Sequence, residues 1–250
     1  MLDDLFEEAS NHINKFDTDI SNYLICNDKK IVTPNETNKV YVKDNLSIKN
    51  IRSILFSPNA NNAKLFIGSE LKGNPSINIQ QSDSTVYIGD TCNLRDVDIR
   101  TQECQACVLI GNGVTTTGSN TWLTGSFPGA GFSSIIIGDD CLFSNDVIIR
   151  GSDGHPVMTL DFSKQINSPT SYIIIEPYVW VGQGVRILKS TTIGAVSVLG
   201  TSSVITRNIP RFSKAYGVPA KFSKLDGVWI KDRREISKDI AKKYLKKYTP

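Results

Sequence analysis

The sequence has little excess of either charge and no long apolar run. Its 250 residues include 28 lysines and arginines and 25 aspartates and glutamates, for a net charge of +3. This balance argues against a nucleic-acid-binding protein, which needs a strongly basic face. No apolar segment reaches the length of a transmembrane helix, and the acidic, amphipathic start MLDDLFEEASNHINKF is unlike a secretory signal peptide. We therefore expect a cytoplasmic protein without a membrane span.

Cysteine and histidine are too few for a metal site. Five cysteines, an odd number without a secretion signal, indicate reduced thiols. The close pair Cys104 and Cys107 has neither a second CxxC nor a nearby histidine, so we expect no zinc there. The two histidines are His12, expected on the surface of an N-terminal helix, and His155, in the segment GSDGHP.

Six-residue repeats dominate the chain from residue 175. The segment 175–210 divides without a slip into IEPYVW, VGQGVR, ILKSTT, IGAVSV, LGTSSV and ITRNIP. The first position is always aliphatic, the fifth is small or β-branched, and glycine recurs at the second. A unit of this length gives one short strand and one sharp turn, so three units close a triangular coil of about 18 residues.

The same register appears earlier in the chain at Ile-Gly pairs, which are Ile67-Gly68, Ile88-Gly89, Ile110-Gly111 and Ile137-Gly138. Their wider spacing indicates residues that bulge from a corner, with two long insertions at about 115–133 and 153–172. Because the aliphatic positions stack on those of neighbouring coils, the pattern predicts an all-β fold, a parallel β-helix over residues 64–224. Cys92 and Cys141 fall at inward fifth positions, so we expect them in the core.

Both ends of the chain follow other patterns. Residues 2–16 place apolar side chains on one helical face, which are Leu2, Leu5, Phe6, Ala9, Ile13 and Phe16. We expect this helix and the irregular segment 20–63 to form an N-terminal part, 1–63, that caps the open end of the stack. The C-terminal part, 225–250, contains a predicted basic helix at 233–248. Such a helix either packs on the protein or touches an anionic membrane surface.

The repeats resemble those of the left-handed β-helix (hexapeptide-repeat) acyltransferases over about residues 64–224. Four segments, in this order and spacing, are similar to the bacterial O-acetyltransferases of capsule and lipopolysaccharide sugars: IGDDCLFSNDVIIRGSDGHPV, VWVGQGVRILK, IGAVSVLGTSSVITRNIP and AYGVPAK. The resemblance implies acetyl-CoA as co-substrate, no metal, a carbohydrate acceptor that includes sialic acid, and a homotrimer in the bacterial cytoplasm or at the inner membrane. The left hand is an exception to the usual right-handed crossover, so handedness rests on the resemblance alone.

Two residues match the catalytic positions of that family. Acetyl transfer to a hydroxyl needs a base, a donor for the oxyanion and aligned substrates. His155 matches the general base, and Trp180, at an outward sixth position, matches the tryptophan beside the thioester, where its indole N–H or a nearby backbone N–H holds the oxyanion. The structural alternative for His155 is a loop residue without a catalytic role. For Trp180 it is a surface ring that a neighbouring subunit covers. Asp153 orients the imidazole, binds the acceptor, or only forms a turn beside Gly154.

The family's CoA groove passes along the turns of the last coils and ends at basic groups that suit phosphates. The matching positions are Trp180, Gly182, Gln183, Lys189, Gly200, Thr201, Thr206, Arg207, Lys221 and Lys224. Taken singly, each lysine is more simply explained as solvated surface. Insertion 115–133 offers Trp122, Phe127 and Phe132 for stacking on a sugar ring or for packing on a neighbouring subunit; we take Trp122 as an acceptor residue.

Three functions follow from these patterns. We favour a sugar O-acetyltransferase over an N-acetyltransferase of an amino sugar, amino acid or antibiotic, and over a non-catalytic β-helix scaffold. A zinc carbonic anhydrase on this fold is excluded, because it needs three histidines around the metal and the predicted helix contains one.

Overall fold

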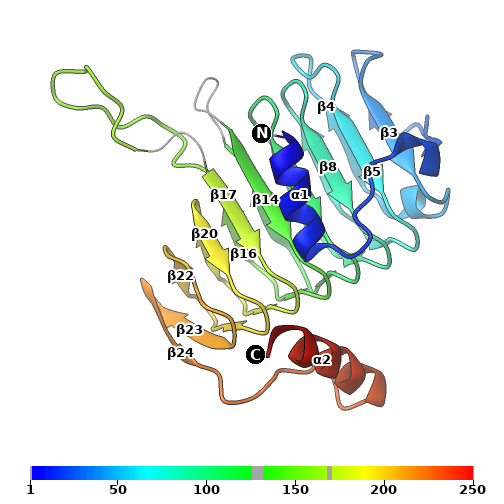
Figure 1. Ribbon diagram of the computed structural model, residues 1–250. Helices are drawn as coiled ribbons and strands as arrows, with labels where there is room; N and C mark the ends of the chain where they lie inside the picture. Colours follow the sequence, from blue (N-terminus) through cyan, green and yellow to red (C-terminus); the bar gives the residue numbers. More distant parts are fainter. Residues whose placement is uncertain (1, 126–131, 168–170, 250) are drawn as a thin grey trace.

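The computed structural model describes residues 2–125, 132–167 and 171–249. The chain winds into a three-sided solenoid in which each coil adds one strand to each of three sheets (Figure 1). All pairs of neighbouring strands are parallel except β1–β3 and β23–β24. The predicted all-β parallel helix is therefore confirmed.

Within the described residues, the three sheets, here named A, B and C, contain eight strands each. In spatial order, sheet A contains β1 (Leu24–Ile25), β3 (Lys39–Val42), β5 (Lys64–Ile67), β8 (Thr85–Ile88), β11 (Cys107–Ile110), β14 (Ser133–Ile137), β17 (Ser171–Ile175) and β20 (Thr191–Ile193). Sheet B contains β2 (Ile31–Val32), β4 (Ser53–Phe56), β7 (Ser76–Ile79), β10 (Val97–Thr101), β13 (Asn120–Leu123), β16 (Val147–Arg150), β19 (Arg186–Leu188) and β22 (Val204–Ile205). Sheet C contains β6 (Lys72–Gly73), β9 (Asn93–Leu94), β12 (Thr115–Thr116), β15 (Leu142–Phe143), β18 (Trp180–Val181), β21 (Val198–Leu199), β23 (Ser213–Gly217) and β24 (Ala220–Lys224).

The core is a set of stacked aliphatic columns inside the coils. The predicted inward isoleucines pair in register from strand to strand of sheet A and are fully buried; they are Ile67, Ile88, Ile110, Ile137, Ile175 and Ile193. Cys92 and Cys141 are also buried in this core, as predicted. Glycines follow these isoleucines because the next coil leaves no room: a Cβ on Gly111 would lie 2.7 Å from the Asp139 backbone nitrogen.

The coils begin earlier than the sequence pattern indicates. Within segment 20–63, expected to be irregular, β2 pairs in parallel with β4 and β3 pairs in parallel with β5. Two short 3-10 helices, Ile20–Asn22 and Ser47–Asn50, lie in the same segment. The expectation of an irregular segment here is wrong, because the buried strands of these coils lack the Ile-Gly pairs that mark the later ones. The insertion expected at 115–133 is also shorter, since β12 and β13 occupy its first half.

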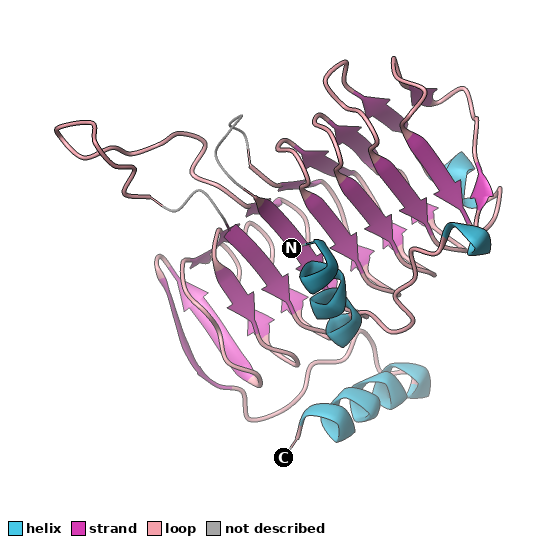
Figure 2. Cartoon of the chain, turned by 45° about the horizontal axis from the view of Figure 1, so that its top comes forward, coloured by secondary structure: helices cyan, strands magenta, loops and turns pink. Residues whose placement is uncertain are grey.

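Helix α1 (Leu2–His12) lies on the outer face of sheet A rather than over the end of the stack (Figures 1 and 2). Its apolar face packs on outward side chains of four strands, which include Phe66, Tyr87, Leu109 and Ile136. His12, expected on the surface, is 7% exposed, and its carbonyl accepts a hydrogen bond from the Asp139 backbone nitrogen (3.2 Å). The prediction that this helix caps the end of the stack is therefore wrong: α1 packs against the side of the solenoid.

Helix α2 (Glu235–Tyr248) is fastened beside sheet C by an aromatic stack. The rings of Tyr178 and Trp229 stack with centroids 4.3 Å apart, the Tyr178 hydroxyl donates to the Trp229 carbonyl (2.9 Å), and the Trp229 indole donates to the Tyr178 carbonyl (3.0 Å). Tyr244 stacks on the same Tyr178 ring and donates to Asp140 (2.6 Å). The predicted C-terminal helix thus packs on the solenoid. No helix in the described part of the chain is long and apolar enough to cross a bilayer.

A buried carboxyl group lies at the corner between sheets B and A. Glu103 is 3% exposed, and within the described residues neither of its carboxyl oxygens has a hydrogen-bond partner. In the next coil Gly125 faces it, and a Cβ at residue 125 would overlap the carboxyl group. Burial raises the pKa of Glu103 to about 7, because a low-dielectric site disfavours the charged form.

We predict a pH-dependent stability that this carboxyl causes. The pKa of Glu103 in the folded chain lies above the ordinary value of 4.5, so the folded chain keeps this proton to a higher pH than the unfolded chain does. The protein therefore loses stability as the pH rises from about 4.5 to about 7. Glu103→Gln should remove this loss. Between pH 5 and pH 8, the free energy of unfolding of the wild type should therefore fall by about 2 kcal/mol more than that of the variant. Urea unfolding at both pH values measures the difference. The exposed Glu36→Gln serves as control, and equal pH slopes for Glu103→Gln and wild type would contradict the prediction.

Candidate active site

His155 lies in a long loop that leaves the solenoid between β16 and β17, and this loop extends away from the coils (Figures 1 and 2). The loop is held together by its own hydrogen bonds. The Asn167 amide donates to Asp153 (2.8 Å) and to the His155 carbonyl (3.0 Å), and its oxygen accepts from the Val157 backbone nitrogen (2.7 Å). His155 itself is exposed, so its imidazole is accessible to an acceptor or to a neighbouring molecule.

Asp153 anchors this loop to the solenoid. Its carboxylate forms an ion pair with Lys189, at the end of β19, with the charged atoms 2.5 Å apart. Partial burial raises the pKa of Asp153, but the hydrogen bonds from Lys189 and Asn167 lower it more, so the group stays ionised. Within the described residues, no hydrogen bond joins this carboxylate to the His155 imidazole. Lys189 likewise contacts the loop that contains His155, whereas the family resemblance implies a contact with CoA.

Trp180 lies on the outer face of sheet C with 40% of its surface exposed. Its ring lies between the in-register neighbours Leu142 and Val198, with the Trp229 ring centroid 6.3 Å away. The backbone N–H of Trp180 donates to the Ser197 carbonyl in the next coil (3.0 Å). Its indole N–H has no partner among the described residues, so this N–H is free to donate, whereas the N–H of its own backbone is not.

The two predicted catalytic residues lie on different sides of one chain. The loop with His155 leaves at the corner where sheet B passes into sheet A, whereas Trp180 belongs to sheet C. The folded subunit therefore does not bring the imidazole and the indole together. A second copy of the chain is needed if both are to act on the same bond.

The predicted CoA-binding residues fall in three places. Gln183 and Thr201 occupy equivalent turns between sheets C and B in adjacent coils, where the Ser202 backbone nitrogen donates to the Gln183 carbonyl (2.7 Å). Gly182 and Gly200 precede these turns, and a Cβ on Gly182 would lie 2.7 Å from the Leu199 carbonyl oxygen. The other members lie one coil past Lys189 (Thr206 and Arg207) and on the terminal strand β24 (Lys221 and Lys224).

The Trp122 side chain is not accessible to an acceptor. Its side chain is fully buried inside the coil, where its ring packs against Phe143 with centroids 4.9 Å apart. The prediction of a sugar-stacking residue is wrong here, because residue 122 belongs to strand β13 and its side chain points inward. Phe132 is also mostly buried, in edge contact with Tyr172. Phe127 lies outside the described residues.

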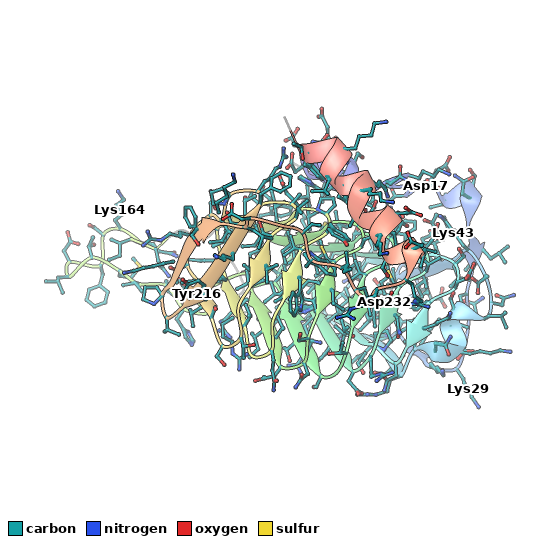
Figure 3. All side chains as sticks on the ribbon, turned by 90° about the horizontal axis from the view of Figure 1, so that it is seen from below. Asp17, Lys29, Lys43, Lys164, Tyr216 and Asp232 are labelled. Atoms are coloured by element: carbon teal, nitrogen blue, oxygen red, sulfur yellow. The ribbon has the colours of Figure 1, made fainter. Side chains whose placement is uncertain are left out.

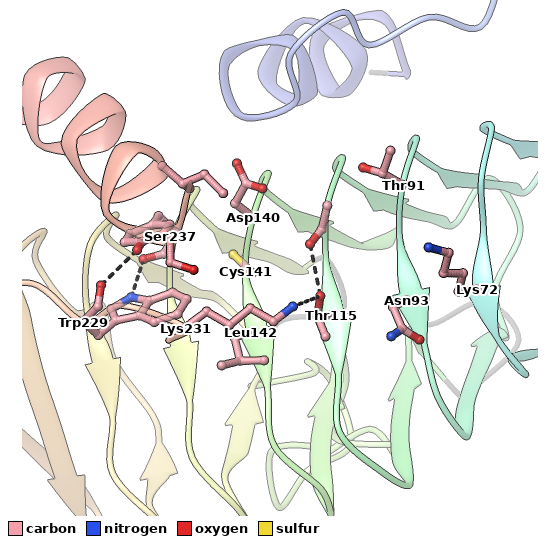
Figure 4. Close-up of a pocket in the computed structure, with 13 residues that line it drawn as sticks. Lys72, Thr91, Asn93, Thr115, Asp140, Cys141, Leu142, Trp229, Lys231 and Ser237 are labelled. Atoms are coloured by element: carbon pink, nitrogen blue, oxygen red, sulfur yellow. Dashed lines mark hydrogen bonds between the residues drawn. The ribbon is translucent and has the colours of Figure 1, made fainter. Parts of the chain in front are cut away.

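Sequence reasoning missed a pocket of about 300 Å³ on the outer face of sheet C. It lies between the strands of this sheet and the segment that leads into α2, and it is lined by Lys72, Asn93, Thr115, Leu142, Trp229 and Lys231 among others (Figure 4). No local sequence pattern could have revealed it, because its walls come from parts of the chain more than 150 residues apart. The described residues contain no group of three potential metal ligands.

Comparison with known proteins decides the family. No family model matches the chain. The crystal structure of the polySia-specific acetyltransferase NeuO superimposes with a TM-score of 0.69 and 30% identity, covering 80% of this chain and 90% of NeuO. The chain belongs to the hexapeptide-repeat acetyltransferases. The polysialic acid O-acetyltransferase OatWY, at 23% identity and a TM-score of 0.63, shares the fold over 86% of this chain and 93% of its own.

Curated relatives of this hexapeptide-repeat acetyltransferase align over shorter segments. The polysialic acid O-acetyltransferase of Escherichia coli O1:K1 is 36% identical over 118 residues, 44% of this chain and 38% of the relative. The enzyme of the same name from Neisseria meningitidis is 28% identical over 123 residues, 43% of this chain and 57% of the relative. The aligned parts therefore span less than two thirds of each of these relatives. Members of this family have a left-handed coil, so the predicted left-handed parallel β-helix is confirmed.

The ion pair between Asp153 and Lys189 generates a prediction about the loop of this acetyltransferase. Lys189→Met removes the only described ion pair of Asp153, so the segment 153–167 should separate from the solenoid more often. Its amide hydrogens should then exchange roughly tenfold faster, while those of β19 stay protected, as measured by hydrogen–deuterium exchange with mass spectrometry. Lys224→Met, which removes a lysine whose described partner is the exposed Asp226 at 3.8 Å, is the control. Unchanged exchange in Lys189→Met would show that the ion pair does not hold the loop.

Proposed function

We propose that the protein is an acetyl-CoA-dependent O-acetyltransferase that acetylates a sugar hydroxyl of a bacterial surface polysaccharide, with sialic acid polymers as the favoured acceptors. The observation that supports this most is that the chain has both an exposed His155 and an outward Trp180 and is 30% identical to NeuO in an alignment that covers 80% of its length. Two relatives named polysialic acid O-acetyltransferase support the acceptor class.

The chemistry follows from the two side chains. The neutral His155 imidazole takes the proton of the acceptor hydroxyl while the oxygen attacks the thioester carbonyl carbon. The Trp180 indole N–H donates to the oxyanion that forms. When the carbon–sulfur bond breaks, the imidazolium gives this proton to the departing thiolate of CoA. The products are the sugar acetate ester and the free thiol, so protons and charge balance.

We further propose a homotrimer in which His155 of one subunit meets Trp180 of its neighbour. The separation of the two residues on one chain supports this arrangement. The loop also exposes apolar side chains that suit burial against a second subunit, and these are Val157, Leu160, Phe162 and Ile166. Because its own hydrogen bonds already order much of the loop, the entropy lost on docking is reduced.

The CoA of the donor is proposed to lie along the last coils. Gln183 and Thr201 would face its pantetheine chain from the turns between sheets C and B, next to Gly182 and Gly200. Arg207, Lys221 and Lys224 are exposed cations suited to its phosphates, and Thr206 adds a hydroxyl. The use of acetyl-CoA as donor favours a reaction in the bacterial cytoplasm.

Replacement of each histidine tests this function. His155→Ala should lower kcat by about two to four orders of magnitude, the usual contribution of a general base, while circular dichroism shows an unchanged fold. His12→Gln is the matched control, because His12 is the last residue of helix α1 and is buried against the outer face of sheet A; the stability of this variant should fall, but its kcat should stay near that of the wild type. Thiol release from acetyl-CoA is measured with capsular polysaccharides, free sugars and amines as acceptors. Full activity of His155→Ala would overturn the mechanism, and turnover of amines alone would overturn O-acetylation.

A further inference from the structure

Outward residues of sheet C form a single column that leads to Trp180. In register from strand to strand, the column contains Lys72, Asn93, Thr115, Leu142 and Trp180. Neighbouring parallel strands lie about 4.8 Å apart, so Lys72 is about 19 Å from Trp180 along the sheet. The residues assigned to CoA lie in the coil of Trp180 itself, from Gly182 on, and in the coils that follow it. The column therefore starts where the donor site ends.

The pocket on sheet C covers this column. Leu142, Trp229 and Ile240 form its apolar wall, and the segment with Trp229 and Lys231 forms its outer side. Lys231 donates to the Thr115 hydroxyl (3.2 Å), and its ammonium group and that of Lys72 point toward each other from opposite ends of the pocket (Figure 4).

The charges in the pocket favour an anionic ligand. In the described part of the chain, neither Lys72 nor Lys231 forms an ion pair, and the Asn93 side chain has no hydrogen-bond partner. One carboxylate, Asp140, also lines the pocket, but it accepts a hydrogen bond from Tyr244 (2.6 Å) and lies 3.8 Å from the Lys243 ammonium group. Two ammonium groups without a carboxylate partner thus remain for a ligand.

We propose that this pocket and the column leading to Trp180 bind the polysaccharide acceptor, with carboxylates of its sugar units against Lys72 and Lys231. This inference rests on the proposed function and adds the place and polarity of acceptor binding. Charge-assisted hydrogen bonds from lysine suit a sugar carboxylate, and Leu142 and Trp229 offer apolar contact to the faces of the sugar rings. Donor and acceptor then approach Trp180 from opposite ends of the solenoid.

The length of the column has a consequence for acceptor size. A sugar unit whose hydroxyl lies at Trp180 is about 19 Å from Lys72, so only an acceptor of several units reaches both. Binding should therefore improve with chain length. Because exposed charges attract less strongly in salt, the KM for a long acidic acceptor should also rise with ionic strength.

The test uses Lys72→Gln, Lys231→Gln and the double variant in the full-length protein. With α2,8-linked polysialic acid, the double variant should show a KM raised roughly tenfold, the size expected for losing charge-assisted contacts. Its kcat and its KM for acetyl-CoA should stay unchanged. The KM for a sialic acid dimer should also stay unchanged, and the salt dependence of the polymer KM should weaken. Lys29→Gln, an exposed lysine at the far end of the solenoid (Figure 3), is the control and should match the wild type throughout.

Two other outcomes separate this inference from the function on which it rests. If the double variant is folded and acetylates polysialic acid with the wild-type KM, the acceptor does not bind in this pocket, and the proposed function stands. If the wild type acetylates neutral polysaccharides but no acidic polymer, the acceptor class is wrong and the lysines have no carboxylate to bind. Either result would overturn the inference.

Discussion

The structure depends on the hydrogen bonds between successive coils. Each coil donates and accepts along three short parallel strands, as in the pairs of β11 with β8 and β14, so equivalent residues of neighbouring coils must lie directly above one another. A buried backbone polar group without a partner is costly, which makes a slip of register unfavourable. Inward positions become apolar columns and outward positions become columns on the surface. The fold thereby converts a sequence repeat into rows of side chains about 4.8 Å apart.

This constraint also decides where function can be added. A strand cannot lengthen without breaking the register, whereas a corner can release extra residues at little cost. The loop with His155 leaves at such a corner, and the Asp153–Lys189 ion pair ties its base to the next coil. Trp180, in contrast, stays on a strand, where its position is fixed by Leu142 and Val198. A rigid indole and a loop-borne imidazole suit a site assembled between subunits.

Much of the fold could be predicted because the repeat itself is physical. Ile110 and Gly111, with their equivalents, indicate the inward column and the tight corner wherever both residue types occur. The first coils escaped prediction because strands such as Lys39–Val42 and Ser53–Phe56 have inward apolar residues without the following glycine. The pattern of α1 predicts an apolar face but not what covers it, so its place on sheet A was not predictable.

The candidate site divides in the same way. His155 and Trp180 stand in recognisable local segments, and the structure leaves both exposed, as a catalytic role requires. The prediction that Trp122 binds the acceptor was wrong because a glycine- and serine-rich segment suggests a loop, whereas residue 122 lies in a strand that points the indole into the core. Lys72 and Lys231 carry no local pattern; only the folding of the C-terminal segment over sheet C brings them to one pocket. Contacts between distant parts of the chain are what the sequence does not display.

The most direct test of the account mixes two inactive variants. His155→Ala and Trp180→Ala subunits are unfolded together, refolded together, and assayed for acetyl transfer to polysialic acid beside each variant refolded alone. If the site is built from the imidazole of one subunit and the indole of its neighbour, mixed trimers contain intact sites, and activity should return to a substantial fraction of the wild-type value. If mixed oligomers form and remain as inactive as either variant alone, the two residues do not act across subunits, and the account of the site is wrong.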